Sequence, residues 1–348
     1  MTMSTDYAFP HHRRSNMIGR MTRRTDPLLV LIPLTVCVAV PLPARGVWLV
    51  GVEHVTGVVI GLMFFLYGAR LSGAEVAEAS RHWRLHGVVL ATTFVLFPLL
   101  GLAVQLVPGG LLPREQALGV LFLCCLPSTV QAAVAFTSMA GGNVPAAICS
   151  AALSNMTGVV VTPVLTGVLM SAHGGVSLGA IGDVAVRLML PFVLGQAVRR
   201  WIGGWVARHR ALLSVVDRGS VVLVAYLGVG RGVVTGTWRM LSPGVLGVLV
   251  AVVVSLLALV LLTTATVPRR LGFGLGDRIT MMFCGSNKSV ATGLPMAGVL
   301  FADHGVGVLL PVLLYHMCQL VTCAWLATRL GHTGHERNRP GPPGVRGV

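Results

Sequence analysis

Long apolar runs follow one another along almost the whole chain, and they restrict its fold more than any other feature. Runs of about 20 apolar residues are typical of membrane-spanning helices, because that length of helix crosses the hydrocarbon core. Hydrophobic residues make up 54% of the chain and charged residues 11%, whereas ordinary globular domains carry about 25% charged residues. We therefore expect an all-α, polytopic membrane protein with little room for a soluble domain.

Ten candidate spans divide the chain, separated by polar or glycine-containing segments. We expect residues 27–330 to form one transmembrane domain, residues 1–26 an N-terminal tail outside the membrane and residues 331–348 a disordered tail. In the second span, Gly57 and Gly61 form a pair of small residues that would let two helices approach closely. The candidate spans are 28–43, 47–70, 85–107, 116–139, 143–170, 178–198, 213–233, 243–267, 277–301 and 306–330.

The arginines are distributed unevenly between the loops, and this distribution predicts the orientation. If the N-terminus is cytoplasmic, 19 arginines lie in inner segments, four in outer segments and two within spans. An excess of Lys and Arg marks the cytoplasmic side of a membrane protein. We therefore expect both termini inside, with the protein in the cell membrane. The same distribution explains the net charge of +15 without a nucleic-acid partner.

Two spans are interrupted near their centres by polar, helix-opening residues. The fourth contains Leu126-Pro127-Ser128-Thr129, and the ninth contains Gly285-Ser286-Asn287-Lys288-Ser289. Unwound backbone at membrane depth is tolerated only where it is buried in protein or lines a wet cavity. One break in each half is typical of the substrate site of a secondary transporter. Because each half has five spans, we expect two inverted repeats, about 27–170 and 178–330.

The residues at the breaks indicate an anion site. Ser128 and Gln131 have the spacing of a short capping box, which would open the second half of the fourth span. The polar residues of the second break can do the same. Each half-helix N-terminus presents free N–H groups and about half a positive charge, so two such ends suit a carboxylate, sulfate or phosphate. The alternative for the first break is a proline kink whose hydroxyls bond back to the helix.

Lys288 is the only lysine among the 26 Lys and Arg residues, and it lies in the middle of the ninth span. A central charge costs on the order of 3 kcal/mol or more on insertion scales, so it should face the protein interior and have a use. It could hold the substrate anion, replace a metal ion and tie the crossing helices together, or exchange the proton that drives transport. The sequence leaves these three uses open.

The candidate substrate-binding residues are the polar side chains at the two breaks and three mid-span residues from neighbouring helices. The mid-span residues could instead be polar contacts between helices. Asp217 and Arg218 fall near a span end, where a solvated pair is the expected role. The candidates are Ser128, Thr129, Gln131, Asn155, Ser286, Asn287, Lys288, Ser289, His316 and Gln319.

The motifs of nucleotide-driven and hydrolytic enzymes do not occur in the sequence. There is no P-loop, no HExxH and no GxSxG, which are the patterns that carry those chemistries. The seven cysteines show neither CxxC nor metal spacing. We therefore expect no enzymatic activity, no bound metal and no organic cofactor.

Five segments together resemble the bile acid:sodium symporter superfamily, in its bacterial SBF-like branch with ten spans. The resemblance implies a panel domain of spans 1, 2, 6 and 7 and a core domain of spans 3–5 and 8–10. It also implies that spans 4 and 9 cross at the site and that organic anions are taken up with sodium. The segments are residues 62–72, 127–144, 153–163, 216–220 and 285–289.

The sodium ligands that the resemblance implies do not carry over to this chain. Sodium-binding members use Ser, Asn and Thr on spans 4 and 5, and a Glu with a nearby Gln on span 9. The corresponding positions fall near four apolar residues, and in span 9 near Ser286 and Val290. Apolar side chains offer no oxygen ligands to Na⁺. We therefore expect Lys288 to replace a bound cation and transport to be sodium-independent or proton-coupled. The four apolar residues are Ala133, Val134, Ala147 and Ala151.

The sequence thus predicts a secondary-active carrier of a small organic anion, working by alternating access in a lipid bilayer. Sodium symport through backbone carbonyls is a variant of this interpretation. A membrane sensor that binds the anion without transporting it is the alternative of a different class. A homodimer is compatible with the sequence.

Overall fold

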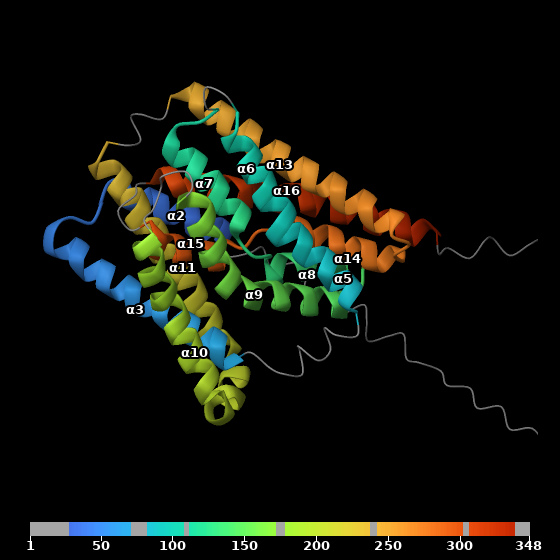
Figure 1. The fold of residues 1–348 in the computed structure, drawn as a ribbon, viewed down its shortest axis with the longest axis horizontal. Helices are drawn as coiled ribbons and strands as arrows, with labels where there is room; N and C mark the ends of the chain where they lie inside the picture. Colours follow the sequence, from blue (N-terminus) through green and yellow to red (C-terminus); the bar gives the residue numbers. More distant parts are fainter. Residues whose placement is uncertain are drawn as a thin grey trace, which may run out of the picture.

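The computed structural model describes residues 28–70, 82–107, 111–171, 178–236, 242–301 and 306–337, and every regular element in these ranges is a helix (Figure 1). The all-helical prediction is therefore confirmed for the described chain. The predicted N-terminal tail, residues 1–26, lies outside the described residues. The helices are α2 (Leu28–Ala39), α3 (Gly46–Arg70), α5 (Trp83–Ala91), the π-helical turn η2 (Thr92–Leu96), α6 (Phe97–Gln105), α7 (Arg114–Cys125), α8 (Val130–Met139), α9 (Val144–Ser171), α10 (Leu178–Arg208), α11 (Arg210–Val234), α13 (Pro243–Arg270), α14 (Leu275–Ser286), α15 (Val290–Leu300) and α16 (Val306–Arg337).

Each predicted span coincides with a helix or with a broken pair of helices. Within the described residues, six helices are long and apolar enough to cross a membrane by themselves, and the number is seven if α7 and α8, which are bent by 63°, are counted as one broken span. The 12 residues of α2 span about 18 Å, which is short of the roughly 30 Å hydrocarbon core. The chain is thus a multi-pass membrane protein. The six are Gly46–Arg70, Trp83–Gln105, Val144–Met170, Ala211–Val234, Pro243–Arg270 and Gly307–Gly331.

The end of the chain departs from the prediction. Helix α16 continues to Arg337, so the first seven residues of the predicted disordered tail, 331–337, are helical. Between Pro311 inside this helix and Pro340 the sequence has no proline, so no helix-breaking residue of that kind ends α16 at residue 330. Residues 338–348 lie outside the described chain.

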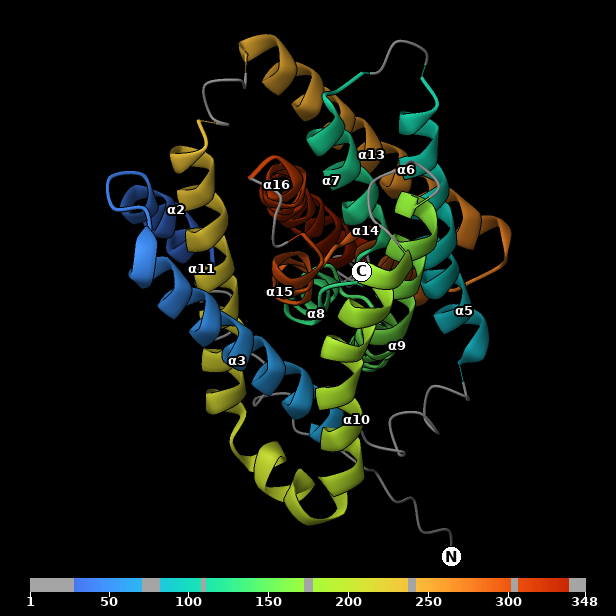
Figure 2. The ribbon, with the colours of Figure 1, turned by 60° about the vertical axis from the view of Figure 1, so that its left-hand side comes forward.

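Helices α3, α10 and α11 lie on one side of the molecule, and α5, α6 and α13 lie on the other (Figures 1 and 2). Helix α3 packs along α10 and α11, while α11 also contacts α2 and α15. Between the two sides run α8, α14, α15 and α16 (Figure 2). The core is a continuous apolar cluster that includes Phe64, Phe122 and Tyr315.

Close packing of α3 on α10 depends on a reciprocal pair of glycines. A Cβ on Gly68 would overlap the carbonyl oxygen of Phe192, and a Cβ on Gly195 would overlap that of Phe65. Small residues at helix contacts let backbones come this close. Gly57 and Gly61 were expected to do this, but a Cβ on either would meet nothing within 4 Å. That expectation was wrong, because these glycines border a cavity instead of a helix.

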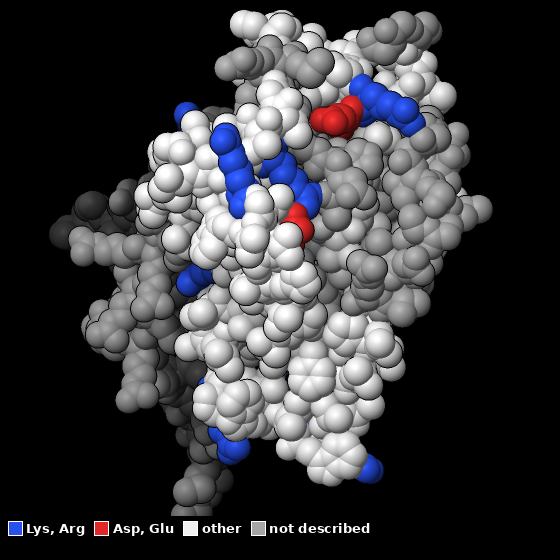
Figure 3. Space-filling view, turned by 90° about the vertical axis from the view of Figure 1, so that its left-hand side faces the viewer, with Lys and Arg blue, Asp and Glu red and all other residues white. Residues whose placement is uncertain are grey.

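The described surface is suited to lipid contact. On the face shown in Figure 3, uncharged residues cover most of the described surface, and the few acidic side chains lie next to basic ones. Many large apolar side chains on the helices are exposed, among them Val58, Leu262 and Val321. A surface of this kind would aggregate in water but is stable in hydrocarbon.

Candidate functional site

The two predicted breaks exist, and they meet. Between α7 and α8 the chain is extended at Leu126 and Thr129, and between α14 and α15 it is extended at Asn287 and Ser289. The amide of Ser289 donates a hydrogen bond of 2.9 Å to the carbonyl of Pro127. Backbone groups freed by one break therefore form hydrogen bonds with backbone groups freed by the other. We call the place where the two breaks meet the crossing.

Helices α8 and α15, which follow the two breaks, differ in how their N-termini are capped. Ser289 is the N-cap of α15, and its hydroxyl accepts a hydrogen bond of 3.2 Å from the amide of Thr292. Helix α8 begins after Thr129, and no side-chain hydrogen bond caps it. The capping-box prediction for the first break was therefore wrong, because the hydroxyl of Ser128 donates across the crossing to the carbonyl of Cys284 at 2.6 Å. The first-turn amides of α8 receive no side-chain partner, which leaves them open to a ligand.

Lys288 is buried with 1% of its surface exposed, and its ammonium is fully used. Its Nζ donates to the carbonyl oxygens of Leu126 at 2.7 Å, Cys124 at 3.0 Å and Thr93 at 3.1 Å. It also lies 3.9 Å from the centre of the Phe97 ring. Two of these carbonyls belong to the C-terminal end of α7, where the helix dipole favours a cation. An ammonium has three donors, so none is left for an anion.

The carbonyl of Thr93 is available to Lys288 because of a local irregularity in the chain. In the π-helical turn η2, the amide of Phe97 bonds to the carbonyl of Thr92, five residues back. A hydrogen bond of the same five-residue spacing to the Thr93 carbonyl would have to come from Pro98, which has no N–H group. The π turn and the proline together leave one buried carbonyl without a helical donor, and Lys288 fills it.

Polar side chains of α16 hold the second break in place. Gln319 accepts from the Lys288 amide at 2.7 Å and donates to the Lys288 carbonyl at 2.8 Å. The hydroxyl of Tyr315 donates to the carbonyl of Ser286 at 2.7 Å. Ser286 and Asn287 each donate to a carbonyl one turn back in α14, both at 2.7 Å. These four residues therefore act on the backbone of the break.

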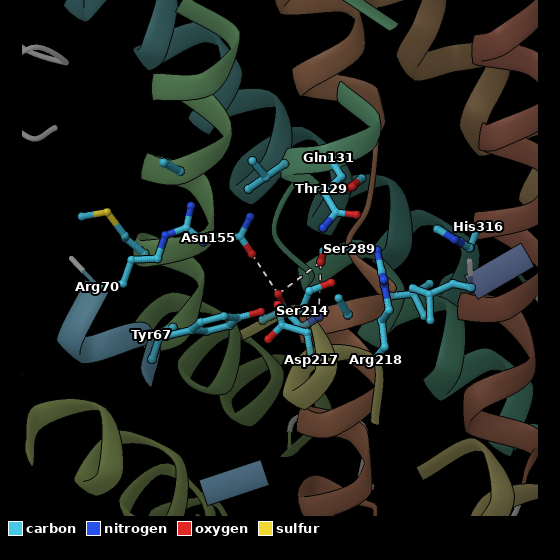
Figure 4. A pocket seen from close by; sticks show the side chains of 18 of the residues that line it. Tyr67, Arg70, Thr129, Gln131, Asn155, Ser214, Asp217, Arg218, Ser289 and His316 are labelled. Atoms are coloured by element: carbon cyan, nitrogen blue, oxygen red, sulfur yellow. Dashed lines mark hydrogen bonds between the residues drawn. The ribbon is translucent and has the colours of Figure 1, made fainter. Parts of the chain in front are cut away.

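A cavity of about 220 Å³ lies beside the crossing, between α3, α8, α9, α11, α15 and α16 (Figure 4). The N-termini of α8 and α15 both border it. Asn155 donates to the carbonyl of Ser128 at 2.6 Å and accepts from Thr292 at 2.8 Å, and this ties α9 to both breaks. Five predicted candidates border the cavity: Thr129, Gln131, Asn155, Ser289 and His316. The other five are buried behind its wall: Ser128, Ser286, Asn287, Lys288 and Gln319.

Sequence reasoning missed the charged wall of the cavity. Tyr67 and Arg70 reach it from the end of α3, and Ser214, Asp217 and Arg218 reach it from α11 (Figure 4). The Tyr67 hydroxyl is within hydrogen-bonding reach of the Asp217 carboxylate. The signal was present, because most of these residues belong to two of the segments that carried the family resemblance. Their position near span ends made a solvated interface the simpler interpretation.

Three of the span 4 and 5 positions expected to correspond to sodium ligands form an apolar contact. Ala133 and Ala147 are fully buried, with Val134 packed against their cluster. The thiol of Cys284 lies 3.7 Å from the carbonyl of Ala147. These side chains offer no oxygen to a cation.

Comparison with known proteins identifies the family. Residues 26–332 match the model of the SBF-like CPA transporter family. The chain is 48% identical over 308 residues to an uncharacterized protein of Pseudomonas aeruginosa, which covers 87% of this chain and 92% of that protein. It is 43% identical over 313 residues to YfeH of Escherichia coli, which is named as a symporter. The matched residues cover 89% of this chain and 94% of that protein.

A more distant relative is the Sodium/bile acid cotransporter 7 of Rattus norvegicus. The two are 29% identical over 272 residues, which cover 77% of this chain and 80% of that protein. The family model spans nearly all of the described helices, and the relatives named for a function are transporters. The chain therefore belongs to the SBF-like CPA transporter family of membrane proteins, within the bile acid:sodium symporter superfamily.

Proposed function

We propose that this protein is a secondary-active transporter that carries an amphipathic organic anion through the cavity at the crossing by alternating access. The observation that carries the proposal is the meeting of two half-helix N-termini at one cavity with arginine side chains in its wall. Helix N-termini attract anions through free N–H groups and the dipole. Bile acids, which the name of the rat relative mentions, belong to this class of substrate.

The lining supports an anion with an apolar body. Arg70 and Arg218 outnumber the single acidic residue, Asp217, so the wall favours one negative charge. Much of the remaining surface is apolar, as at Leu28 and Phe192. The anionic group would lie near the uncapped N-terminus of α8, where Thr129 and Gln131 offer further donors.

Lys288 is proposed to make a bound Na⁺ unnecessary. Its ammonium occupies a position among three carbonyl oxygens, which is the kind of ligand set that a sodium ion would need. The span 4 and 5 positions expected to bind sodium elsewhere carry apolar side chains, such as Ala133 and Ala147. Transport would then be coupled to protons or otherwise independent of sodium.

The proposed architecture is ten spans in two inverted repeats, 27–170 and 178–330. The panel would contain α2, α3, α10 and α11, and the core would contain the other helices, with both termini cytoplasmic in the cell membrane. The similar breaks in the α7–α8 and α14–α15 pairs support the repeat. The packing of α3 on α10 and α11 supports the panel.

The test is uptake of labelled taurocholate and a panel of small carboxylates into proteoliposomes, with imposed Na⁺ or H⁺ gradients. Saturable accumulation that ignores Na⁺ would support the proposal, and an Arg218→Gln variant should lower the affinity. Protein-free liposomes provide the control. A stoichiometric Na⁺ requirement would contradict the coupling, and binding without accumulation would indicate a sensor instead of a carrier.

A further inference from the structure

A second cavity, of about 500 Å³, lies along the same helices as the first but nearer their opposite ends. On α3 it is bordered by residues from Glu53 to Gly61, on α11 by residues from Val224 to Arg231, and on α15 by residues from Ala297 to Val299. We call it the outer cavity, because the arginine distribution predicts this end of the molecule to be outside. The cavity at the crossing is then the inner cavity.

A closed layer separates the two cavities. On α3 it contains Met63 and Phe64, on α11 Ser220 and Val221, and on α15 Leu294, and all five are fully buried. The hydroxyl of Ser220 contacts the sulfur of Met63 at 3.4 Å across the helix interface. The same three helices thus carry one cavity, a layer of buried side chains and a second cavity in succession.

Apart from one ion pair and Thr56, the residues that line the outer cavity are apolar. Among its lining residues only Glu53 of α3 and Arg231 of α11 are charged, and the two form a salt bridge. Ile60, Leu227 and Phe301 contribute to the apolar walls. Gly57 and Gly61 leave space there, since a Cβ on either would meet nothing within 4 Å.

We propose that the outer cavity is a second binding site for an amphipathic monoanion, in which Arg231 binds the anionic group and Glu53 competes with it. This inference extends the proposed transport function by assigning the opposite mouth of the path. With the cavity empty, Glu53 neutralises Arg231 and spares the cost of an unpaired, partly desolvated charge. An entering carboxylate or sulfonate would displace Glu53, which is half-buried, while its apolar body fills the space beside Gly57.

The test measures binding of 2-naphthalenesulfonate by calorimetry to the full-length protein in phosphatidylcholine nanodiscs. A sulfonate keeps its charge at any ordinary pH, and 2-naphthalenesulfonamide serves as the neutral control. The variants are Glu53→Gln, Arg231→Gln and Gly57→Leu, with Gly51→Leu as the matched control on α3. Gly51 also has open space around it, but it does not border the cavity.

We expect wild type to bind two sulfonates, one in each cavity. Glu53→Gln should strengthen the outer site about tenfold, because it removes the negative charge that competes for Arg231, and Arg231→Gln should weaken it at least about tenfold, because it removes the positive charge itself. Gly57→Leu should leave only the inner site, and Gly51→Leu should keep both. The double variant Glu53→Gln with Arg231→Gln removes both charges together and leaves neither unpaired, so its melting temperature checks that the fold tolerates these changes.

Equal stoichiometry in wild type and Gly57→Leu would overturn the proposal, as would Glu53→Gln binding no tighter than wild type. If wild type bound only one sulfonate and Gly57→Leu abolished that binding, the inner site would be absent. That result would contradict the proposed function and leave the outer site standing. The two failures are therefore distinguishable in one experiment.

Discussion

At the scale of single residues, Lys288 shows which features of a site a pattern of residue types can predict and which it cannot. Its burial and its place at a break were predictable, because a lone lysine in an apolar span has to face the protein interior. Its partners were not, because they are main-chain carbonyls at Thr93, Cys124 and Leu126, and any residue type carries a carbonyl. The contacts favour the structural use of Lys288 among the three that the sequence left open.

Replacing Lys288 should therefore destabilise the fold. Lys288→Met keeps the apolar stem but leaves three buried carbonyls without their donor, and each such loss costs about 1–3 kcal/mol. Relief of the buried charge offsets part of this cost, so we expect a net loss on the order of 3 kcal/mol. The measurement is the melting temperature of the detergent-solubilised protein.

The control for Lys288→Met is Arg84→Met. Arg84 is exposed and lies over the Phe273 ring at 5.3 Å, a contact worth about 0.5–1 kcal/mol. Equal melting temperatures for the two variants would mean that Lys288 does not tie the crossing together.

At the scale of helices, the breaks were predicted at their correct positions and their caps only in part. Leu126-Pro127 and Gly285 through Ser289 indicate an interruption by composition. The direction of each hydroxyl depends on the neighbouring helix, and for Ser128 that neighbour is 156 residues away in the chain. The π turn before Pro98 could not be anticipated for the same reason, since its freed carbonyl faces a distant lysine.

The difference between the two caps should be measurable. Ser289→Ala removes the hydroxyl that caps α15, and such a loss costs about 1 kcal/mol. Thr129→Ala at the equivalent position of α8 removes no cap bond and should change stability by less than about 0.5 kcal/mol. Thermal unfolding of both variants in the same detergent gives the comparison, and a larger loss for Thr129→Ala would contradict the structure.

The packing of α3 on α10 leads to a second prediction for the helices. Gly195→Ala forces a Cβ into the Phe65 carbonyl, and because backbone cannot move aside like a side chain, we expect a loss of about 2–3 kcal/mol. Gly51→Ala, on α3 with open space around it, should be neutral or stabilising by up to about 1 kcal/mol. Melting temperatures again decide, and a tolerated Gly195→Ala would mean that the two helices are further apart than described.

At the scale of the whole molecule, the spans and the multi-pass topology could be predicted because they depend on composition along the chain. The cavities could not, because each is formed by segments far apart in sequence. Tyr67 of α3 and Asp217 of α11, for example, have all of α5 through α10 between them along the chain, yet both line the inner cavity (Figure 4). The resemblance to a family named both segments, but only the fold brings them together.

Alternating access would require α11 and α15 to move against each other, because both cavities lie between them. A disulfide at the rim of the outer cavity offers a way to lock this motion, since a Cβ on Gly298 of α15 would lie 3.7 Å from the Cβ of Val224 of α11. Disulfides form at Cβ separations of about 3.5–4.5 Å.

The double variant Val224→Cys with Gly298→Cys should therefore cross-link on oxidation. Because alternating access requires rigid-body movement of these helices, the cross-linked protein should lose transport of taurocholate at least about tenfold. Reduction should restore the rate. Each single variant, oxidised in the same way, controls for the native cysteines, of which Cys37 is exposed. Full transport by the cross-linked protein would show that the substrate passes without relative movement of these two helices.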